Sequence, residues 1–330
     1  MLKAAITGAG YISKIHAKAL QAIPGVELSA VVERYKKTAL PFIAEFGIKN
    51  HYTTVEQLLD QEHIDALVVG TPNYLHAPQT LAALKAGVPV MVEKPMAMNA
   101  RQAQQMQAAS QESGTLLMVA HCWRFDPEVI WLKNQLDTGK LGKIIRTKGY
   151  GVHAGWGPAG WFTHRRLAGG GALADVGIHA LDTARFLLGD PQPLSVYARI
   201  GTHYGNYDVD DTGLVLVNWH GGAVSYIESG WWQPHTDGPN AATQLYGETG
   251  FGQLFPTFIT DRSGKSNPGF TYPRVDHAPQ SLYDEQMRYF IRCIRQGANP
   301  CPGGLEGWIN MKIVDAAYRS ARTGRAIEVG

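Results

Sequence analysis

Short apolar runs alternate with segments of helical spacing along the first third of the chain. The runs predict strands at residues 3–7, 26–32, 64–69, 88–92 and 116–120. Hydrophobic residues three or four positions apart predict intervening helices at residues 12–20, 40–46, 55–59, 79–86 and 99–113. Such alternation is typical of a parallel sheet with helices on both faces. Ligands bind at the carboxyl ends of the strands in this architecture, so the residues after each strand are candidates for chemistry.

The pattern changes after about residue 121. Strand-like segments now follow one another, at residues 144–152, 193–200, 212–219, 223–231 and 242–246. One helix is predicted between them, at residues 172–188. Successive strands with few helices predict mostly antiparallel pairing. We therefore expect an α/β chain of two domains, with a parallel sheet in residues 1–121 and an α+β domain in residues 122–330.

Composition narrows the class of protein. A chain of 330 residues, 45% hydrophobic and 18% charged, can form two folded domains without disulfide support. Its formal net charge of +2 gives no reason to expect nucleic acid or an anionic membrane as a partner. No apolar stretch approaches the ~20 residues of a membrane span, and no signal peptide is visible. Three cysteines without a paired spacing fit a reducing compartment, so we expect a cytoplasmic protein.

The turn after the first predicted strand has the pattern of a dinucleotide site. Gly8 permits a tight turn, Gly10 lets the backbone approach a pyrophosphate, and the following helix N-terminus supplies N–H groups. Ser13 replaces the usual third glycine and is small enough for close packing. Glu33, at the end of the second strand, can bind both ribose hydroxyls, which favours NAD. The adjacent Arg34 can instead face the 2′-phosphate of NADP, so both cofactors stay open.

Three residues in later segments can carry out acid–base chemistry. Lys94 ends the fourth strand, and Asp175 and His179 lie four positions apart, on one face of a predicted helix. His179 can accept the proton of a hydroxyl at neutral pH while a nicotinamide accepts the hydride. Lys94 can stabilise the developing alkoxide, and Asp175 can orient the imidazole or bind a substrate hydroxyl.

Together these segments resemble the Gfo/Idh/MocA oxidoreductase family over nearly the whole chain. The matching motifs are Gly-Ala-Gly-Tyr-Ile-Ser at 8–13 with His16, Thr-Pro-Asn-Tyr-Leu-His at 71–76, Glu-Lys-Pro at 93–95, Arg-Phe-Asp-Pro at 124–127, the Gly-Gly-Gly-Ala-Leu-Ala-Asp-x-Gly-x-His segment at 169–179 and the tail at 315–325. The resemblance implies a catalytic trio of Lys94, Asp175 and His179. It also implies cofactor contacts from Gly8, Gly10, Tyr11, Ile12, Glu33, Arg34, Thr71, Pro72, Asn73, His76, Glu93 and Lys94.

The resemblance also has consequences for the backbone and for assembly. It implies a large open-faced sheet in the second domain that pairs with another subunit, giving a homodimer or homotetramer. It further implies a cis peptide bond between Lys94 and Pro95. Residues 1–121 would then bind the dinucleotide, and residues 122–330 would bind the substrate and form the oligomer.

Tryptophans and polar residues in the second domain suit a sugar or cyclitol, which has apolar C–H faces and a rim of hydroxyls. The candidate substrate contacts are Lys94, Trp123, Arg124, His153, Trp161, Asp175, His179 and Tyr283, and His235 is a further polar residue of this domain. Asp208, Asp210 and Asp211 lie close in sequence but lack a nearby His or Cys ligand set. We therefore expect a solvated turn there and no metal.

The predicted function is an NAD(P)-dependent dehydrogenase or reductase. It would transfer a hydride between the nicotinamide and a secondary alcohol or ketone of a sugar, cyclitol or similar polyol. Two alternatives stay open. A redox-neutral glycosidase or lyase would use the same trio through transient oxidation of the sugar. A dinucleotide-binding sensor without turnover would share the fold, because fold alone does not determine function.

Overall fold

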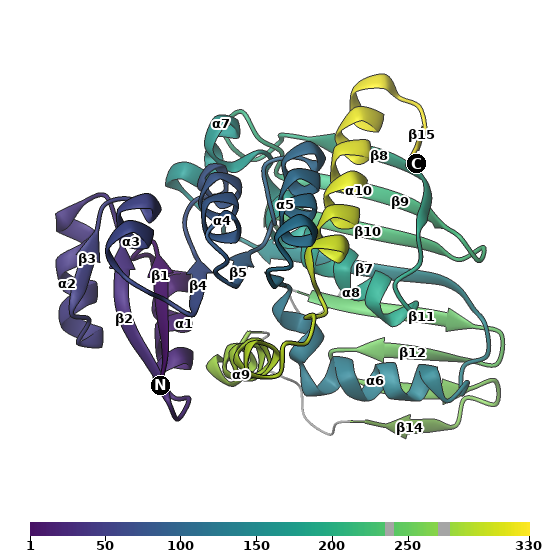
Figure 1. The fold of residues 1–330 in the computed structure, drawn as a ribbon. Helices are drawn as coiled ribbons and strands as arrows, with labels where there is room; N and C mark the ends of the chain where they lie inside the picture. Colours follow the sequence, from purple (N-terminus) through teal and green to yellow (C-terminus); the bar gives the residue numbers. More distant parts are fainter. Residues whose placement is uncertain (235–240, 270–277) are drawn as a thin grey trace. The chain divides into compact units, whose positions relative to one another are not determined.

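The computed structural model describes residues 1–234, 241–269 and 278–330 (Figure 1). Contacts between residues divide the chain into two compact units. Unit 1 comprises Met1–Cys122 and Ala278–Trp308, and unit 2 comprises Trp123–His277 and Ile309–Gly330. The sequence interpretation assigned residues 278–308 to the second domain, whereas their contacts lie in unit 1. One reason is that the Gln280 side chain donates a hydrogen bond to the Ile15 carbonyl at 3.0 Å.

Unit 1 contains the predicted parallel sheet. Its order is β3 (Asn50–Tyr52), β2 (Val26–Val32), β1 (Leu2–Thr7), β4 (Ala66–Val69), β5 (Val90–Glu93) and β6 (Leu117–Ala120), and every adjacent pair is parallel. The order reverses between β1 and β4, which is the position where ligands bind in such sheets. The sequence pattern predicted five of these strands and missed β3, whose Asn-His-Tyr sequence contains no apolar run.

Helices flank this sheet, and polar caps and glycines set many of their ends. They are α1 (Tyr11–Gln21), α2 (Lys36–Phe46), α3 (Val55–Gln61), η1 (Asn73–Leu75), α4 (His76–Lys85), α5 (Ala100–Ser113) and α9 (Gln280–Gln296). The Thr54 and Asn99 side chains accept hydrogen bonds from first-turn N–H groups of α3 and α5. Gly47 and Gly114 end α2 and α5 in the left-handed conformation that glycine adopts without strain.

Unit 2 contains a nine-stranded sheet within the described residues. Its order is β14 (Ser266–Pro268), β13 (Phe258–Asp261), β12 (Gly250–Leu254), β11 (Ala241–Gly247), β7 (Ile144–Ala154), β10 (Val224–Gln233), β9 (Thr212–Trp219), β8 (Pro193–Gly201) and β15 (Ile327–Glu328). Among the described strands of this sheet only β7 and β10 pair in parallel, so the prediction of a mostly antiparallel sheet is confirmed.

Helical segments of unit 2 contact the strands of this sheet. The helical segments not yet named are η2 (Cys122–Phe125), α6 (Pro127–Asp137), η3 (Gly160–Thr163), α7 (Arg165–Ala168), the π-helical η4 (Leu173–Gly177), α8 (Ile178–Leu187) and α10 (Gly304–Thr323), and those in contact with the strands include α6, η4 and α8. Glycines allow η4 to approach the strands closely. A Cβ at Gly151 would lie 2.3 Å from the Val176 carbonyl oxygen, and one at Gly177 would lie 2.7 Å from the Ser229 Cβ.

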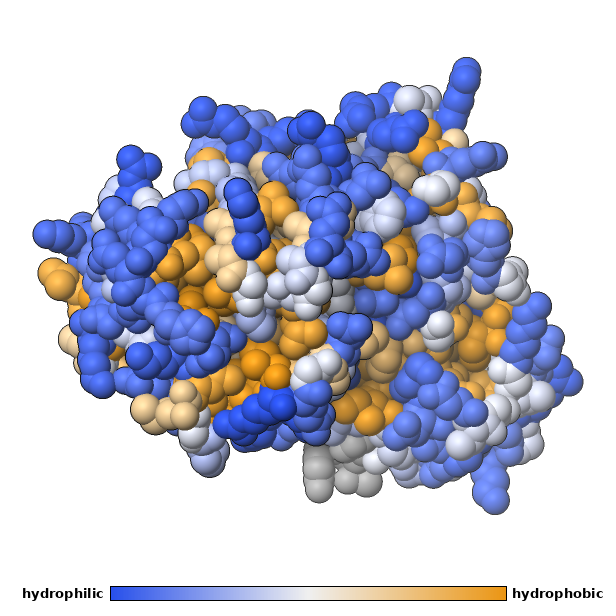
Figure 2. All heavy atoms as spheres, viewed as in Figure 1, coloured by the Kyte–Doolittle hydropathy of each residue, from blue (hydrophilic) through white to orange (hydrophobic). Residues whose placement is uncertain are grey.

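One face of the second sheet carries exposed apolar side chains. Along β9, Val215 and Val217 are buried, whereas the alternating Leu214 and Leu216 are 41% and 40% exposed. In the face drawn in Figure 2, hydrophilic residues predominate and hydrophobic residues occupy smaller areas between them. The part of the chain that the structure describes contains no helix that is both long and apolar enough to cross a membrane.

Candidate active site

The turn after β1 has the geometry expected for a dinucleotide. Gly8 has φ +81°, and a Cβ there would lie 2.9 Å from the Gly70 carbonyl oxygen, so only glycine fits. Gly10 is the N-cap of α1, and a Cβ there would meet nothing within 4 Å. The N–H groups at the start of α1 therefore border open space that phosphate oxygens can occupy.

Ser13 provides the close packing that the usual third glycine would allow. Its side chain is fully buried, and its hydroxyl donates to the carbonyls of Thr7 and Gly70, both at 3.3 Å. A Cβ on Gly70 would lie only 2.6 Å from the Ser13 Oγ. Ser13 thus holds α1 against the ends of β1 and β4.

A carboxylate and a guanidinium follow β2. The Glu33 Oε1 accepts a hydrogen bond from the Tyr35 backbone N–H at 2.9 Å, and the Glu33 carbonyl lies 2.8 Å from His51 Nε2. These contacts hold the Glu33 carboxylate at the end of the strand. Arg34 is exposed, and its guanidinium lies 5.9 Å from the centre of the Tyr35 ring.

His76 connects the loops that follow β4 and β5. Its side chain is buried, with Nδ1 2.8 Å from the Pro95 carbonyl oxygen and Nε2 2.8 Å from that of Thr71. Burial lowers the pKa of His76, although the two carbonyls and Glu93 act in the opposite direction. The contacts shown by the structure therefore make His76 a brace between Thr71 and Pro95. Asn73, which begins η1, is also buried.

A buried contact between His16 and Glu93 adjoins Lys94. His16 Nε2 is 2.8 Å from Glu93 Oε1, and Glu93 Oε2 accepts a hydrogen bond from the Lys94 backbone N–H at 3.0 Å. Burial alone raises the pKa of Glu93, but the hydrogen bond and charge of His16, with Lys94 and His76, lower it overall. The Lys94–Pro95 peptide bond is cis, so that prediction is confirmed.

Tyr283, a predicted substrate contact, lies behind this pair instead. Its side chain is only 9% exposed, and its ring packs edge-on against His16 with centroids 5.8 Å apart. Burial raises the pKa of Tyr283 well above its ordinary value. A residue that is buried against His16 in this way supports the His16–Glu93 contact, and we do not retain Tyr283 as a substrate contact.

In unit 2, Asp175 and His179 lie on either side of a change in helix type. The sequence interpretation placed both on one α-helix, whereas Asp175 is in the π-helical η4 and His179 is in α8. Single π-helical turns occur frequently at functional sites. The Asp175 Oδ2 accepts a hydrogen bond from Trp231 Nε1 at 3.1 Å. The His179 ring stacks on Trp123, with centroids 5.0 Å apart and an angle of 27° between the planes.

Asp210 caps the segment that carries Asp175. Its carboxylate accepts hydrogen bonds from the backbone N–H groups of Gly171 (2.8 Å) and Leu173 (2.9 Å) and from the Tyr318 hydroxyl (2.7 Å). Burial raises the pKa of Asp210, and these donors partly offset that effect. A Cβ at Gly171 would lie 1.9 Å from the Asp210 carbonyl oxygen, which explains a glycine at this position.

The expectation of a solvated turn at Asp208, Asp210 and Asp211 is therefore wrong for two of the three residues. Asp210 is 6% exposed and Asp211 is fully buried, while Asp208 is exposed. Asp211 accepts hydrogen bonds from the backbone N–H groups of His203 and Tyr204 at 2.8 and 2.7 Å. Backbone donors, which sequence spacing does not show, make burial of these carboxylates possible. Within residues 1–234, 241–269 and 278–330, no group of His, Cys, Asp and Glu side chains is arranged to hold a metal.

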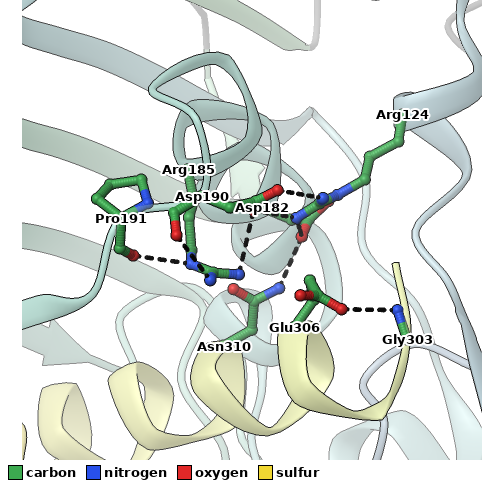
Figure 3. A network of polar contacts seen from close by, with 8 residues as sticks. All are labelled: Arg124, Asp182, Arg185, Asp190, Pro191, Gly303, Glu306 and Asn310. Atoms are coloured by element: carbon green, nitrogen blue, oxygen red, sulfur yellow. Dashed lines mark hydrogen bonds and ion pairs between the residues drawn. The ribbon is translucent and has the colours of Figure 1, made fainter. Parts of the chain in front are cut away.

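Arg124 belongs to a buried network rather than to an accessible binding surface (Figure 3). Its guanidinium is bonded to both oxygens of Asp182 at 2.8 Å and to both oxygens of Asp190 at 2.8 and 2.9 Å. Asn310 donates to the same Asp182 carboxylate at 2.8 Å. Burial lowers the pKa of Arg124, but the two carboxylates raise it overall. The predicted substrate contact is therefore corrected: Arg124 anchors α8 through Asp182.

The other predicted aromatic contacts differ in exposure. Trp123 is 8% exposed, whereas His153 and Trp161 are partly exposed. His153 stacks on Trp156 with centroids 3.6 Å apart, and Trp161 stacks on Phe162 at 3.8 Å. His235 lies outside the described residues.

Comparison with protein families agrees with this geometry. Residues 2–121 match the model of an oxidoreductase family with an NAD-binding Rossmann fold, and residues 129–251 match the C-terminal domain of the same family. The chain belongs to the Gfo/Idh/MocA oxidoreductase family. The predicted resemblance and fold class are thus confirmed, and the first domain is the NAD-binding Rossmann domain of the family.

Several named proteins align with nearly the full length of this chain. D-glucoside 3-dehydrogenase of Escherichia coli (strain K12) is 30% identical over 346 residues, covering 99% of this chain and 97% of that protein. The scyllo-inositol 2-dehydrogenase (NAD(+)) of Bacillus subtilis (strain 168) is 27% identical and covers 99% and 96%. A structure of GenD2 from gentamicin A biosynthesis in complex with NAD has a TM-score of 0.88 at 27% identity, covering 100% and 96%. Levoglucosan dehydrogenase in complex with NADH has a TM-score of 0.90 at 23% identity, covering 100% and 99%, and shares the fold.

Three residues that contact or support the candidate site residues were not predicted: His16 contacts Glu93, Trp231 contacts Asp175, and Asp210 caps the segment that carries Asp175. His16 belonged to a recognised motif, but nothing in sequence indicated its partner Glu93 across 77 positions. Trp231 was one of several tryptophans of the second domain, and Asp210 was one of three nearby acidic residues. Each contact joins segments that are far apart in sequence, so hydrophobic periodicity and motif spacing could not predict it.

Proposed function

We propose that this protein transfers a hydride between a nicotinamide dinucleotide and a secondary alcohol or ketone of a sugar, cyclitol or similar polyol. One observation carries the proposal. A dinucleotide-binding turn of the right geometry and the residues Lys94, Asp175 and His179 occur in one chain whose full-length relatives are named sugar and inositol dehydrogenases. Two of these relatives act, by name, on a glucoside and on scyllo-inositol.

The residues of unit 1 fit a nicotinamide dinucleotide. Its pyrophosphate would lie at Gly8 and Gly10, against the N–H groups of Tyr11 and Ile12 at the start of α1. When bound, the cofactor supplies the hydride acceptor or donor. Further cofactor contacts would come from the loop after β4, at Thr71, Pro72 and Asn73, and from the end of β5, at Glu93 and Lys94, whereas His76 would act by bracing Thr71 and Pro95.

NAD is the cofactor that we propose as preferred. The Glu33 carboxylate, oriented by the Tyr35 N–H, would accept hydrogen bonds from the ribose hydroxyls and repel a 2′-phosphate. Arg34, which is exposed beside Tyr35, is the residue that would bind the 2′-phosphate if NADP were used.

We assign the proton chemistry to three residues. The imidazole of His179 would accept the hydroxyl proton during oxidation and return it during reduction. Asp175 would orient the imidazole or bind a neighbouring hydroxyl, and the Lys94 ammonium would stabilise negative charge on the reacting oxygen. His153 and Trp161, both partly exposed, remain the proposed contacts to the sugar or polyol.

Absorbance of the reduced nicotinamide tests the proposal. The protein is incubated with NAD or NADP and a panel of sugars, glycosides, cyclitols and polyols. We expect absorbance to rise with at least one compound and the rate to fall roughly 10²- to 10⁴-fold in His179→Ala. Sugar release from a glycoside without a net change in absorbance would indicate the redox-neutral lyase instead. Tight NAD binding with no turnover in either direction would indicate a sensor.

We further propose that the exposed face of β9 pairs with a second copy of this chain in the cytoplasm. Leu214 and Leu216 present apolar surface there, which pairing would remove from water. None of the three cysteines, all of which the structure describes, is in a disulfide, as a reducing compartment requires. Light scattering coupled to size-exclusion chromatography should find a dimer or tetramer, and Leu216→Arg should dissociate it. A monomeric wild-type protein would exclude this assembly.

A further inference from the structure

Trp231 is held rigidly against Asp175. Its side chain is fully buried, its ring meets Tyr207 edge-on at 6.2 Å, and it packs in a cluster with Ala172 and Val209. Its backbone N–H donates to the Asp211 carbonyl at 2.8 Å. With the ring fixed in this way, the indole N–H that reaches Asp175 Oδ2 at 3.1 Å is fixed in direction as well.

Trp123 is held against His179 with similar rigidity. Its ring stacks on the imidazole and meets Phe255 edge-on, with centroids 6.2 Å apart. The next residue, Arg124, binds Asp182 with two hydrogen bonds of 2.8 Å. Asp182 lies three positions after His179 in α8, so this ion pair joins the segment bearing Trp123 to the helix bearing His179.

The exposed areas argue against a direct substrate role for either tryptophan. A sugar ring stacks on an accessible aromatic face, but Trp123 is 8% exposed and Trp231 is fully buried. One face of Trp123 is already occupied by His179. The contacts of Trp231 with Asp175 and of Trp123 with His179 instead orient groups that can carry a proton. An N–H donor restricts the rotation of a carboxylate, and a stacked indole face restricts the rotation of an imidazole.

We propose that Trp123 and Trp231 are positioning residues that hold His179 and Asp175 in the orientation needed for proton transfer. The inference rests on the proposed function, in which His179 is the acid–base group. It reassigns Trp123 from the sugar-binding role expected from sequence. It also gives the π-helical turn a role, since η4 presents Asp175 to the Trp231 indole.

Trp231→Phe tests the indole donor, and Trp219→Phe is its matched control. Trp219 is 1% exposed in the same sheet, and its Nε1 donates to the Ser225 hydroxyl at 2.8 Å. Both changes therefore remove one buried indole and one hydrogen bond. We expect Trp231→Phe to lower kcat by roughly 10- to 100-fold, as for loss of a hydrogen bond to a charged group, with KM and the Kd for NAD little changed. Equal kcat values in the two variants would overturn the assignment of Trp231.

Trp123→Phe and Trp123→Leu separate positioning from substrate binding. Phenylalanine keeps an aromatic face for His179, whereas leucine removes it. We expect kcat to fall at least about tenfold further in Trp123→Leu than in Trp123→Phe, with similar KM values in the two. A raised KM with unchanged kcat in both variants would show that Trp123 binds the sugar, and would overturn the inference for this residue.

A measurement without substrate tests the contact between Trp231 and Asp175 independently of the proposed function. In the full-length protein, the indole N–H resonance of Trp231 is assigned by NMR from Trp231→Phe. Asp175→Ala should shift that resonance and accelerate its exchange with water, while the Trp219 indole resonance stays unchanged. Lack of turnover on every substrate would count against the proposed function alone. An unchanged Trp231 resonance in Asp175→Ala would overturn the positioning contact itself, whatever the activity.

Discussion

Asp210→Ala should loosen the segment that carries Asp175 and His179, although the three hydrogen bonds that the Asp210 carboxylate accepts come from other residues. The carboxylate is 6% exposed and accepts three hydrogen bonds, from Gly171, Leu173 and Tyr318. Loss of a helix cap costs about 0.5–2 kcal/mol, and each buried donor left unpaired costs about 1–3 kcal/mol. Removing Asp210 also removes the free-energy cost of burying its carboxylate, and this offsets part of the loss. We therefore expect the free energy of unfolding to fall by about 3–5 kcal/mol.

The assay must locate this loss as well as measure it, because a chain with two units need not unfold in one step. Thermal unfolding gives the overall destabilisation, and amide hydrogen exchange locates it. We expect faster exchange at residues 171–179 and a kcat reduced at least about tenfold, since a displaced acid–base group costs that much or more. Asp208→Ala is the control, because Asp208 is exposed and accepts a single backbone hydrogen bond, from Arg165 at 2.7 Å. It should change stability by less than about 0.5 kcal/mol.

The pH dependence of Asp210→Asn provides a second check. Burial raises the pKa of Asp210 above its unfolded value of 3.8, so the folded protein binds this proton more tightly than the unfolded chain. The stability linked to this group is therefore greatest below pH 3.8 and decreases as pH rises through the raised pKa. The difference in the free energy of unfolding between wild type and Asp210→Asn should therefore change between pH 3.8 and the raised pKa of Asp210. Equal exchange at residues 171–179 in Asp210→Ala and Asp208→Ala would refute the capping argument.

Three further predictions concern other buried or charged groups. His16→Phe should destabilise unit 1 by about 3–5 kcal/mol because it leaves the Glu93 carboxylate buried without its partner. The pKa of Glu93 in the folded protein is lowered from 4.5. The stability linked to this group is therefore present above pH 4.5 and is lost as pH falls through the lowered pKa. In urea titrations at several pH values, His16→Phe should make the free energy of unfolding depend less on pH in this range. Glu33→Ala should weaken NAD binding about tenfold in calorimetry and leave NADP binding unchanged or tighter. Arg124→Met should lower the melting temperature by several degrees, as expected for about 3–5 kcal/mol, without raising KM; a raised KM alone would restore Arg124 as a substrate contact.

The local parts of the site were predictable because each depends on a few consecutive residues. A strand of apolar residues, a glycine with φ +81° and a helix start lie within residues 2–13, so the turn could be predicted from that short segment. The same holds for most strands of both sheets, whose apolar runs or alternation follow from burial on one or both faces. β3 was not predicted because its three residues are polar. They form a strand because they pair with β2.

The roles of individual side chains depended on contacts between distant segments. Trp123, Arg124 and Tyr283 have the chemistry of sugar-binding residues, yet each is buried against a partner that lies far along the chain. Asp210 has the sequence context of a solvated turn, but the close approach of Gly171 turns it into a helix cap. Local periodicity and short motifs were therefore enough to predict most strands and helices, the dinucleotide turn and the family. The accessibility of the polar and aromatic groups could be seen only in the folded chain, because burial and hydrogen bonding depend on which segments the fold brings together.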